Sequence, residues 1–332
     1  MVNIGIAVSK FGKEQKYMVY KKSEYYQKVL DWFDNYSDHP FIQKLDSVFQ
    51  INGNYYHNYK MNGNAFYFDE KGKIQRSKVF DRTGFGDQKD NKLLPFYNEM
   101  QAFSYESDFR KFYKINKAVY DHQIDVYQDS LNLREMQRWL EKQFPENSAY
   151  DTYNIIFSPL VYGNQSSTWF ESNGFKELQP HVNFPYRQSL KRLMPISKTA
   201  EYVYRGNIVF TELNHGYINP EAEKYDQRIS LAISNRDIWV DKSKGPNYYG
   251  GNSLFNEYMN WVLINLRIID YVPVGEQEKL INNVSRMMVK NRGFLKFGEF
   301  SQFLVRLYRG KDAETTVADL YPQIISWFEE NN

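Results

Sequence analysis

The stretch that decides the fold of this chain is residues 207–220, which reads Asn-Ile-Val-Phe-Thr-Glu-Leu-Asn-His-Gly-Tyr-Ile-Asn-Pro. Its only readily charged side chains are Glu212 and His215, and most other positions are apolar or neutral. A helix places residues three and four apart on one face, so Thr211, Glu212 and His215 would lie together. We therefore expect a largely apolar helix that presents an acid and an imidazole on one side.

The composition of the whole chain limits the classes of function. Its 332 residues include 42% hydrophobic side chains, enough for a substantial core. Lys and Arg number 42 against 40 Asp and Glu, so the net charge is only +2, which argues against nucleic acid as a partner. No apolar run approaches the roughly 18 residues of a membrane span. There is no cysteine, so a metal site would have to use His, Asp or Glu.

Helical periodicity dominates the chain. A helix is expected at 23–35, where Ser23 stands at the N-cap, and helical patterns fill 107–144. Residues 65–75 predict a hairpin with Gly72 at a positive φ, and short strands are expected at 153–160 and near 181–186. A polar loop is expected at 163–167. Helices are then predicted over 199–219, 221–234, 253–270, 274–291, 297–309 and 314–330.

The first residues, Met-Val-Asn-Ile, are apolar and β-branched, and they predict a strand. Such an abrupt start suits a chain from which a leader has been removed. We therefore expect an exported or periplasmic protein if a leader was removed and a cytoplasmic one otherwise.

The 207–220 stretch is similar to the zinc-protease helix motif His-Glu-x-x-His, in which two imidazoles one turn apart bind zinc and the Glu polarises its water. Here Thr211 stands at the first imidazole position, Glu212 at the base and His215 at the second imidazole. Asn219 follows one turn later, on the same face. A purely structural alternative remains open, in which His215 is a partly buried imidazole bonded to a carboxylate and Glu212 belongs to a polar network.

Residues 253–266 read Ser-Leu-Phe-Asn-Glu-Tyr-Met-Asn-Trp-Val-Leu-Ile-Asn-Leu, with Glu257 as the one charged side chain. Burying a lone carboxylate costs several kcal/mol unless a cation, a metal or hydrogen bonds compensate it. Glu257 is therefore a candidate third zinc ligand, since in gluzincins a Glu on a later helix completes the site. An internal ion pair with Arg267 or Lys224 explains it equally well.

Four segments carry a resemblance to a known family: 157–161 (Phe-Ser-Pro-Leu-Val), 211–220, 255–259 (Phe-Asn-Glu-Tyr-Met) and 292–297 (Arg-Gly-Phe-Leu-Lys-Phe). Together they resemble an uncharacterised bacterial domain-of-unknown-function family with zincin-like members. The likeness runs in order from about Ser23 to the C-terminus.

The resemblance implies that Glu212 matches the catalytic base, His215 the second imidazole and Glu257 the carboxylate ligand. It also shows two departures. Thr211 replaces the first imidazole, and Gln165 and Ser166 stand where relatives carry a His. Both changes remove nitrogen ligands, so a further ligand would have to come from elsewhere, with His181 as the candidate.

These patterns predict a mainly helical α+β fold with a small central sheet and a zincin-like core. Residues 1–150 are expected to form an N-terminal helical lobe with a β-hairpin, and residues 151–332 a zincin-like lobe with C-terminal helices. The first hypothesis for function is a zinc metallopeptidase-like hydrolase acting on a peptide or protein, secreted if a leader was removed. The alternative is a catalytically inactive zincin-like protein that binds a peptide, glycan or protein. Because aromatic residues reach 17%, glycan binding through Tyr and Trp is a third, less favoured hypothesis.

Overall fold

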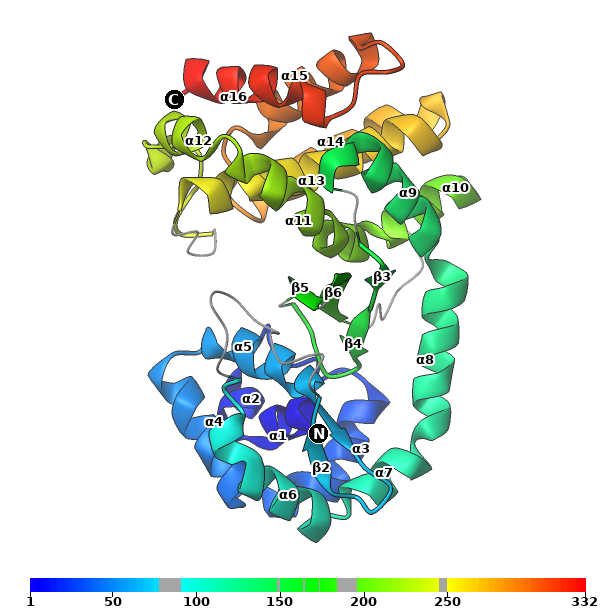
Figure 1. Cartoon of the computed structure of the whole chain (residues 1–332), viewed down its shortest axis with the longest axis vertical. Helices are drawn as coiled ribbons and strands as arrows, with labels where there is room; N and C mark the ends of the chain where they lie inside the picture. The colour runs from blue at the N-terminus through cyan, green and yellow to red at the C-terminus, as the bar shows by residue number, and fades with distance from the viewer. Residues whose placement is uncertain (78–90, 148–149, 164, 173, 184–195, 245–249) are drawn as a thin grey trace. The chain divides into compact units, whose positions relative to one another are not determined.

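The computed structural model describes residues 1–77, 91–147, 150–163, 165–172, 174–183, 196–244 and 250–332 (Figure 1). The chain divides into two compact units that interleave along the sequence. Unit 1 comprises Met1–Gln128 and Tyr150–Tyr186, and unit 2 comprises Asp129–Ala149 and Arg187–Asn332. Their limits lie elsewhere than the expected division at residue 150. The division into an N-terminal helical lobe (1–150) and a zincin-like lobe (151–332) stays a prediction.

Unit 1 combines short helices with two small sheets. Its helices are α1 (Val2–Val8), α2 (Lys10–Glu14), α3 (Glu24–Phe33), η1 (Asp34–Tyr36), α4 (Pro40–Ile51), α5 (Tyr55–Asn62), η2 (Gly63–Ala65), η3 (Leu94–Phe96), α6 (Tyr97–Glu106), α7 (Phe109–Ile115) and α8 (Lys117–Ser130), whose last two residues fall in unit 2. Its strands are β1 (Phe66–Phe68), β2 (Ile74–Arg76), β3 (Thr152–Tyr153), β4 (Ile156–Ser158), β5 (Ser166–Ser172) and β6 (Phe175–Asn183).

The N-terminal segment is a helix, so the strand expected there was wrong. Every residue of α1 except Asn3 is buried. α1 packs against α3 and α4, and a Cβ at Gly5 would lie 2.9 Å from the Phe41 ring. Glycine thus allows a close approach of α4. Tertiary burial on all sides outweighs the β propensity of the apolar residues.

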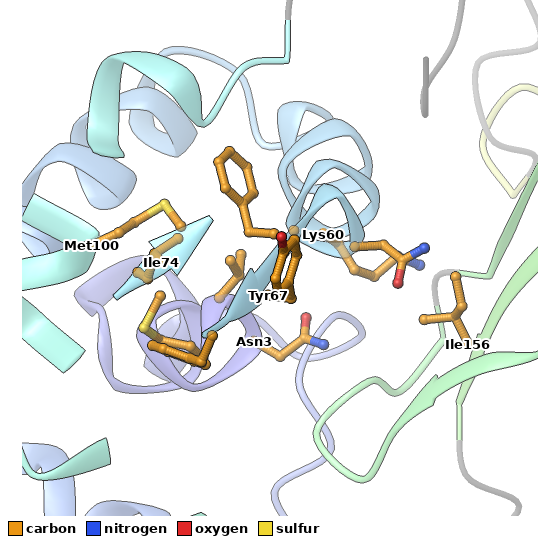
Figure 2. Close-up of a pocket in the computed structure, with 12 residues that line it drawn as sticks. Asn3, Lys60, Tyr67, Ile74, Met100 and Ile156 are labelled. Atoms are coloured by element: carbon orange, nitrogen blue, oxygen red, sulfur yellow. The ribbon is translucent and has the colours of Figure 1, made fainter. Parts of the chain in front are cut away.

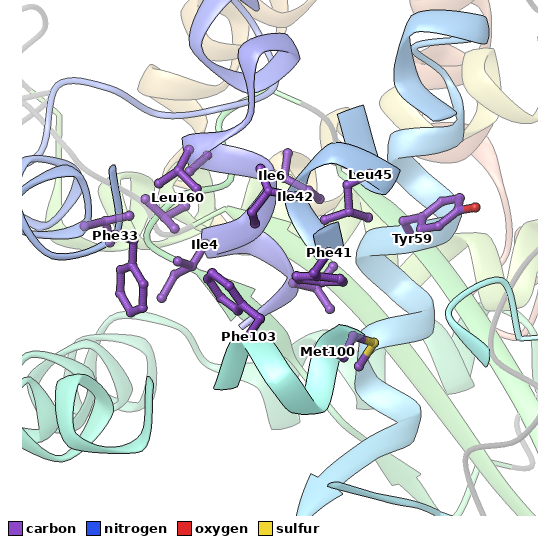
Figure 3. Packing of buried hydrophobic residues seen from close by; sticks show 14 of the residues in the cluster. Ile4, Ile6, Phe33, Phe41, Ile42, Leu45, Tyr59, Met100, Phe103 and Leu160 are labelled. Carbon is purple, nitrogen blue, oxygen red and sulfur yellow. The ribbon is translucent and has the colours of Figure 1, made fainter. Parts of the chain in front are cut away.

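The core of unit 1 forms around α1. Figure 3 shows Ile4 and Ile6 of α1 among aromatic and aliphatic side chains from other helices, including Phe33, Phe41 and Phe103. Leu160, which follows β4, belongs to the same cluster. A segment distant in sequence therefore completes this core.

The expected helix at 23–35 is confirmed as α3, and the Ser23 side chain accepts a hydrogen bond from the Tyr26 N–H. The hairpin expected at 65–75 is confirmed as β1 and β2, which pair antiparallel. Gly72 has φ +81° in the connecting turn, where a side chain would be strained.

The larger sheet is organised on β6, which pairs in parallel with β3 and β4 and antiparallel with β5. The strand expected at 153–160 is two short strands. The loop expected at 163–167 overlaps β5, so that prediction was wrong in part, because Ser166 and Ser167 give no apolar signal. β6 covers 175–183 and starts before the strand expected at 181–186, whose residues 184–186 lie outside the described residues.

Unit 2 is helical in its described residues. Its helices are α9 (Leu133–Gln143), η4 (Pro145–Asn147), α10 (Lys198–Arg205), α11 (Asn207–Glu223), α12 (Asp226–Ala232), η6 (Arg236–Ile238), α13 (Gly251–Tyr271), α14 (Val274–Lys290), α15 (Phe297–Gly310), η7 (Ala318–Leu320) and α16 (Tyr321–Glu330).

Helix α13 is the core element of unit 2. It contacts α10, α11, α12, α14 and α15, and every residue from Leu254 to Ile268 except Glu257 is buried. A helix that is apolar on nearly all sides is expected in such a position. The predicted helix 199–219 is interrupted at Gly206, where a Cβ would lie 2.3 Å from Met136 Cε.

The fold is mainly helical α+β with a small sheet, as the sequence predicted. Within the described ranges, no helix combines the length and the apolar character needed to cross a bilayer.

Candidate functional site

The helices predicted to carry the site do pack together. α11 carries Glu212 and His215, α13 carries Glu257, and the two helices are in extensive contact within unit 2. Glu257 Oε1 lies 3.5 Å from His215 Nε2. Their side chains are 14% and 18% exposed, respectively, so they meet in a largely buried place. The central prediction of the sequence, that this imidazole and this acid meet, holds in the structure.

Both ring nitrogens of His215 have partners. Nδ1 lies 3.2 Å from Asn219 Oδ1, one helical turn further along α11. Nε2 lies 3.0 Å from the side-chain amide nitrogen of Asn260, on α13. Asn260 is held in turn, because the Asn214 side chain donates to its backbone carbonyl over 3.0 Å. The ring is therefore fixed between two helices.

Glu257 also pairs with an arginine. Arg292 donates from its guanidinium to Glu257 Oε2 over 3.2 Å, and its Cζ lies 4.8 Å from the Trp261 ring centroid. The two partners proposed for Glu257 from sequence were wrong. Arg267 pairs with Glu135 at 2.7 Å, and Lys224 pairs with Glu221 and Glu146.

The environment favours a charged imidazole. Burial alone disfavours protonation of His215, but the hydrogen bond and charge of Glu257, the charge of Glu212 and the hydrogen bond to Asn219 outweigh it and raise its pKa to about 9. A protonated Nε2–H can donate to Glu257 Oε1, but the Asn260 side chain presents its NH₂ group to the same nitrogen. Rotating that amide by 180° exchanges its oxygen and nitrogen, and Asn260 Oδ1 has no other partner among the described residues. The rotated amide fits the charged ring.

Thr211 stands at the first position of the Thr-Glu-x-x-His stretch, and its hydroxyl is hydrogen-bonded within the helix. Thr211 is 2% exposed, and its Oγ1 donates to the Ile208 carbonyl over 2.8 Å, within its own helix. Glu212 is buried and acts on His215 through its charge. Its role as a catalytic base stays a prediction.

The remaining candidate ligand, His181, lies on β6 in unit 1. It is 2% exposed, so its side chain is buried. Burial and the charge of Lys60 hold its pKa well below the ordinary value, which leaves the ring neutral. Ser166, one of the two residues that replace a His of the resembling family, is its cross-strand neighbour on β5. Gln165 immediately precedes β5.

The donors at α11 and α13 are few for zinc. Two ligands of a tetrahedral zinc lie about 3.4 Å apart, so the 3.5 Å between His215 Nε2 and Glu257 Oε1 suits such a pair. A catalytic zinc site normally has three protein ligands. Among the described residues, no group of three or more His, Asp or Glu side chains is placed to hold a metal. The zinc prediction remains a prediction.

Sequence reasoning missed Asn260 and Arg292 as members of this cluster. Asn260 lies three residues after Glu257, a spacing that places both on one face of α13, so helical geometry would have found it. Arg292 lies within a segment that carried the family resemblance, but its partner depends on how the connection after α14 folds back. No local pattern contains that information.

Comparisons of this chain with protein-family models, with curated proteins and with solved structures gave no match.

Proposed function

We propose that this protein is a catalytically inactive, zincin-like binding protein, in which the residues at the metal-site positions form a partly buried ion network. The observation that supports this most is the position of Glu257, whose carboxylate lies between His215 and Arg292. Arg292 pairs with Glu257 Oε2 and so neutralises the negative charge with which a carboxylate ligand binds zinc. The contacts of His215 with Glu257 and Asn260 join α11 to α13. The partner is a peptide or protein, the class that zincin ancestry implies.

The test is metal binding by matched variants. The native protein, Thr211→His and Thr199→His are purified without chelator, dialysed against micromolar zinc and analysed for bound metal. Thr199 is exposed on α10 and controls for a histidine added elsewhere in unit 2. We expect substoichiometric zinc in the native protein and in Thr199→His, and close to one equivalent only in Thr211→His, where a second imidazole joins His215 one turn away.

A second candidate function, a metal-dependent peptidase, is favoured by the ligand-like spacing of His215 and Glu257. In that case the native protein would hold about one equivalent of zinc, and His215→Gln and Glu257→Gln would each lose it. It would also hydrolyse a fluorescent casein in a chelator-sensitive way. Those two results together would refute the inactive assignment.

A further inference from the structure

We propose that a cavity in unit 1, between α1, the α5–η2–β1 segment and β4, binds a small neutral polyhydroxylated molecule of monosaccharide size. The site lies in another part of the chain from His215, and the proposal does not rest on the proposed function. The cavity has a volume of about 240 Å³. That is smaller than the roughly 300–1,000 Å³ of pockets for drug-sized ligands, which favours a compact ligand.

The walls of the cavity are partly apolar and partly polar. Figure 2 shows Asn3, Lys60 and Tyr67 on the helix and hairpin side, and Ile156 of β4 on the opposite side. Phe66 and Met100 contribute apolar surface. Tyr67 is 55% exposed, so its ring is available at the rim as a flat surface. An aromatic rim beside amide groups suits the apolar C–H face and the hydroxyl edge of a sugar ring.

Within the described part of the chain, two polar atoms of the lining make no hydrogen bond. Asn3 Oδ1 and Asn64 Nδ2 are both shielded from solvent and make no hydrogen bond with the described residues. An unpaired buried polar atom costs about 1–3 kcal/mol, so it usually has a water or ligand partner. One of these atoms accepts and the other donates.

The adjacent sheet face extends this polar surface. His181 pairs with Ile156 on one side and with Ser166 on the other, and cross-strand partners project to the same face of a sheet. His181 Nε2 and Ser166 Oγ are also buried without hydrogen-bond partners in the described part of the chain. Lys60, which lines the cavity, also helps to lower the pKa of His181 through its charge, after the larger effect of burial.

The mixture of donors and acceptors selects the chemical class. An ionised carboxylate only accepts hydrogen bonds, so it would leave the amide oxygen, Asn3 Oδ1, unpaired. A hydroxyl both donates and accepts, and can therefore satisfy an amide oxygen, an amide N–H, a serine hydroxyl and a neutral imidazole. Adjacent hydroxyls on a ring supply several such groups within a small volume.

The experiment measures binding of glucose, galactose, mannose and N-acetylglucosamine to the full chain by saturation-transfer NMR and calorimetry, with inorganic phosphate and acetate as anion probes. We expect at least one sugar to bind and neither anion to compete. Asn64→Ala should lower the affinity for that sugar by roughly 5- to 10-fold, the effect of one lost hydrogen bond. Asn54→Ala, an exposed change at the start of α5, should leave the affinity unchanged.

Variants at the rim separate binding from folding. Tyr67→Ala removes an exposed ring and should lower the affinity for the sugar at least 5-fold without changing the melting temperature. Tyr67→Phe keeps the ring and should keep the affinity. Tyr105→Ala, 84% exposed on α6, is the matched control. Binding of phosphate or acetate in place of any sugar, binding of none of the probes, or sugar binding that is indifferent to both Asn64→Ala and Tyr67→Ala would overturn the proposal.

Discussion

Replacing Glu257 with Gln tests the ion network directly. The change keeps the size of the side chain but removes the negative charge between His215 and Arg292, so two cations are left facing a neutral amide. Removing one partner of a fully buried ion pair costs about 3–5 kcal/mol, and an exposed pair contributes about 0.2–1 kcal/mol. The three side chains here are 14%, 18% and 27% exposed, close to the buried limit. We therefore expect a loss of about 3 kcal/mol at pH 7.

The assay is thermal and urea unfolding, followed by hydrogen exchange of peptides from α11 and α13. For a unit of this size, about 3 kcal/mol corresponds to a fall in melting temperature of roughly 6–12 °C. Protection should be lost first in α11 and α13, because the network joins these two helices. Glu278→Gln is the matched control, since Glu278 is exposed on α14 in the same unit.

A double-mutant cycle isolates the coupling. His215→Gln combined with Glu257→Gln should be less destabilising than the sum of the single changes by at least about 1 kcal/mol, because the two side chains are in contact. If Glu257→Gln loses no more stability than Glu278→Gln, or if the two changes are additive, the network does not hold these helices together and our reasoning fails.

Three further outcomes are expected. The pKa of His215 is about 9 in the folded protein against about 6.5 in the unfolded chain. Its protonation should therefore add on the order of 3 kcal/mol to the free energy of unfolding below pH 6.5, and this stabilisation should be lost as pH rises through 9. In urea titrations, the native protein and His215→Gln should have the same free energy of unfolding at pH 10. Glu135→Gln should lower the free energy of unfolding by about 3 kcal/mol, because Arg267 is 1% exposed and would lose its carboxylate partner. Arg267→Met removes the buried charge itself and should lower the stability less. Calorimetry that ranks the two variants in the opposite order would contradict this. Gly12→Ala should destabilise by about 3 kcal/mol or more, since its Cβ would lie 1.8 Å from the Ile6 carbonyl oxygen, and an unchanged melting temperature would rule out the close approach.

The sequence carried the local part of the fold. Ser23 at an N-cap and Gly72 in a turn act on neighbouring residues, so their effects could be predicted and were confirmed. α1 could not be predicted, because its helix depends on burial by α3 and α4. Strand β5 begins with serines and takes its register from β6, a contact that no local pattern encodes.

The candidate site followed the same division. A lone acid in an apolar helix predicted that Glu257 would be compensated, and it is. The two cations proposed for it, Arg267 and Lys224, were wrong, because the packing of segments distant in sequence decides which cation reaches Glu257. Packing turned Arg267 toward Glu135 and brought Arg292 to Glu257.

The alternation of the two units has a consequence for synthesis on the ribosome. Leu160 belongs to the core around α1, yet residues 129–149, which are made before it, belong to unit 2. When residues 1–128 have been made, this core still lacks Leu160, and α9 is made before α11, the helix that it contacts. Apolar surface that both units later bury is exposed at this stage, so chaperones are expected to bind there. A fragment that ends at residue 150 would expose the same apolar surface permanently.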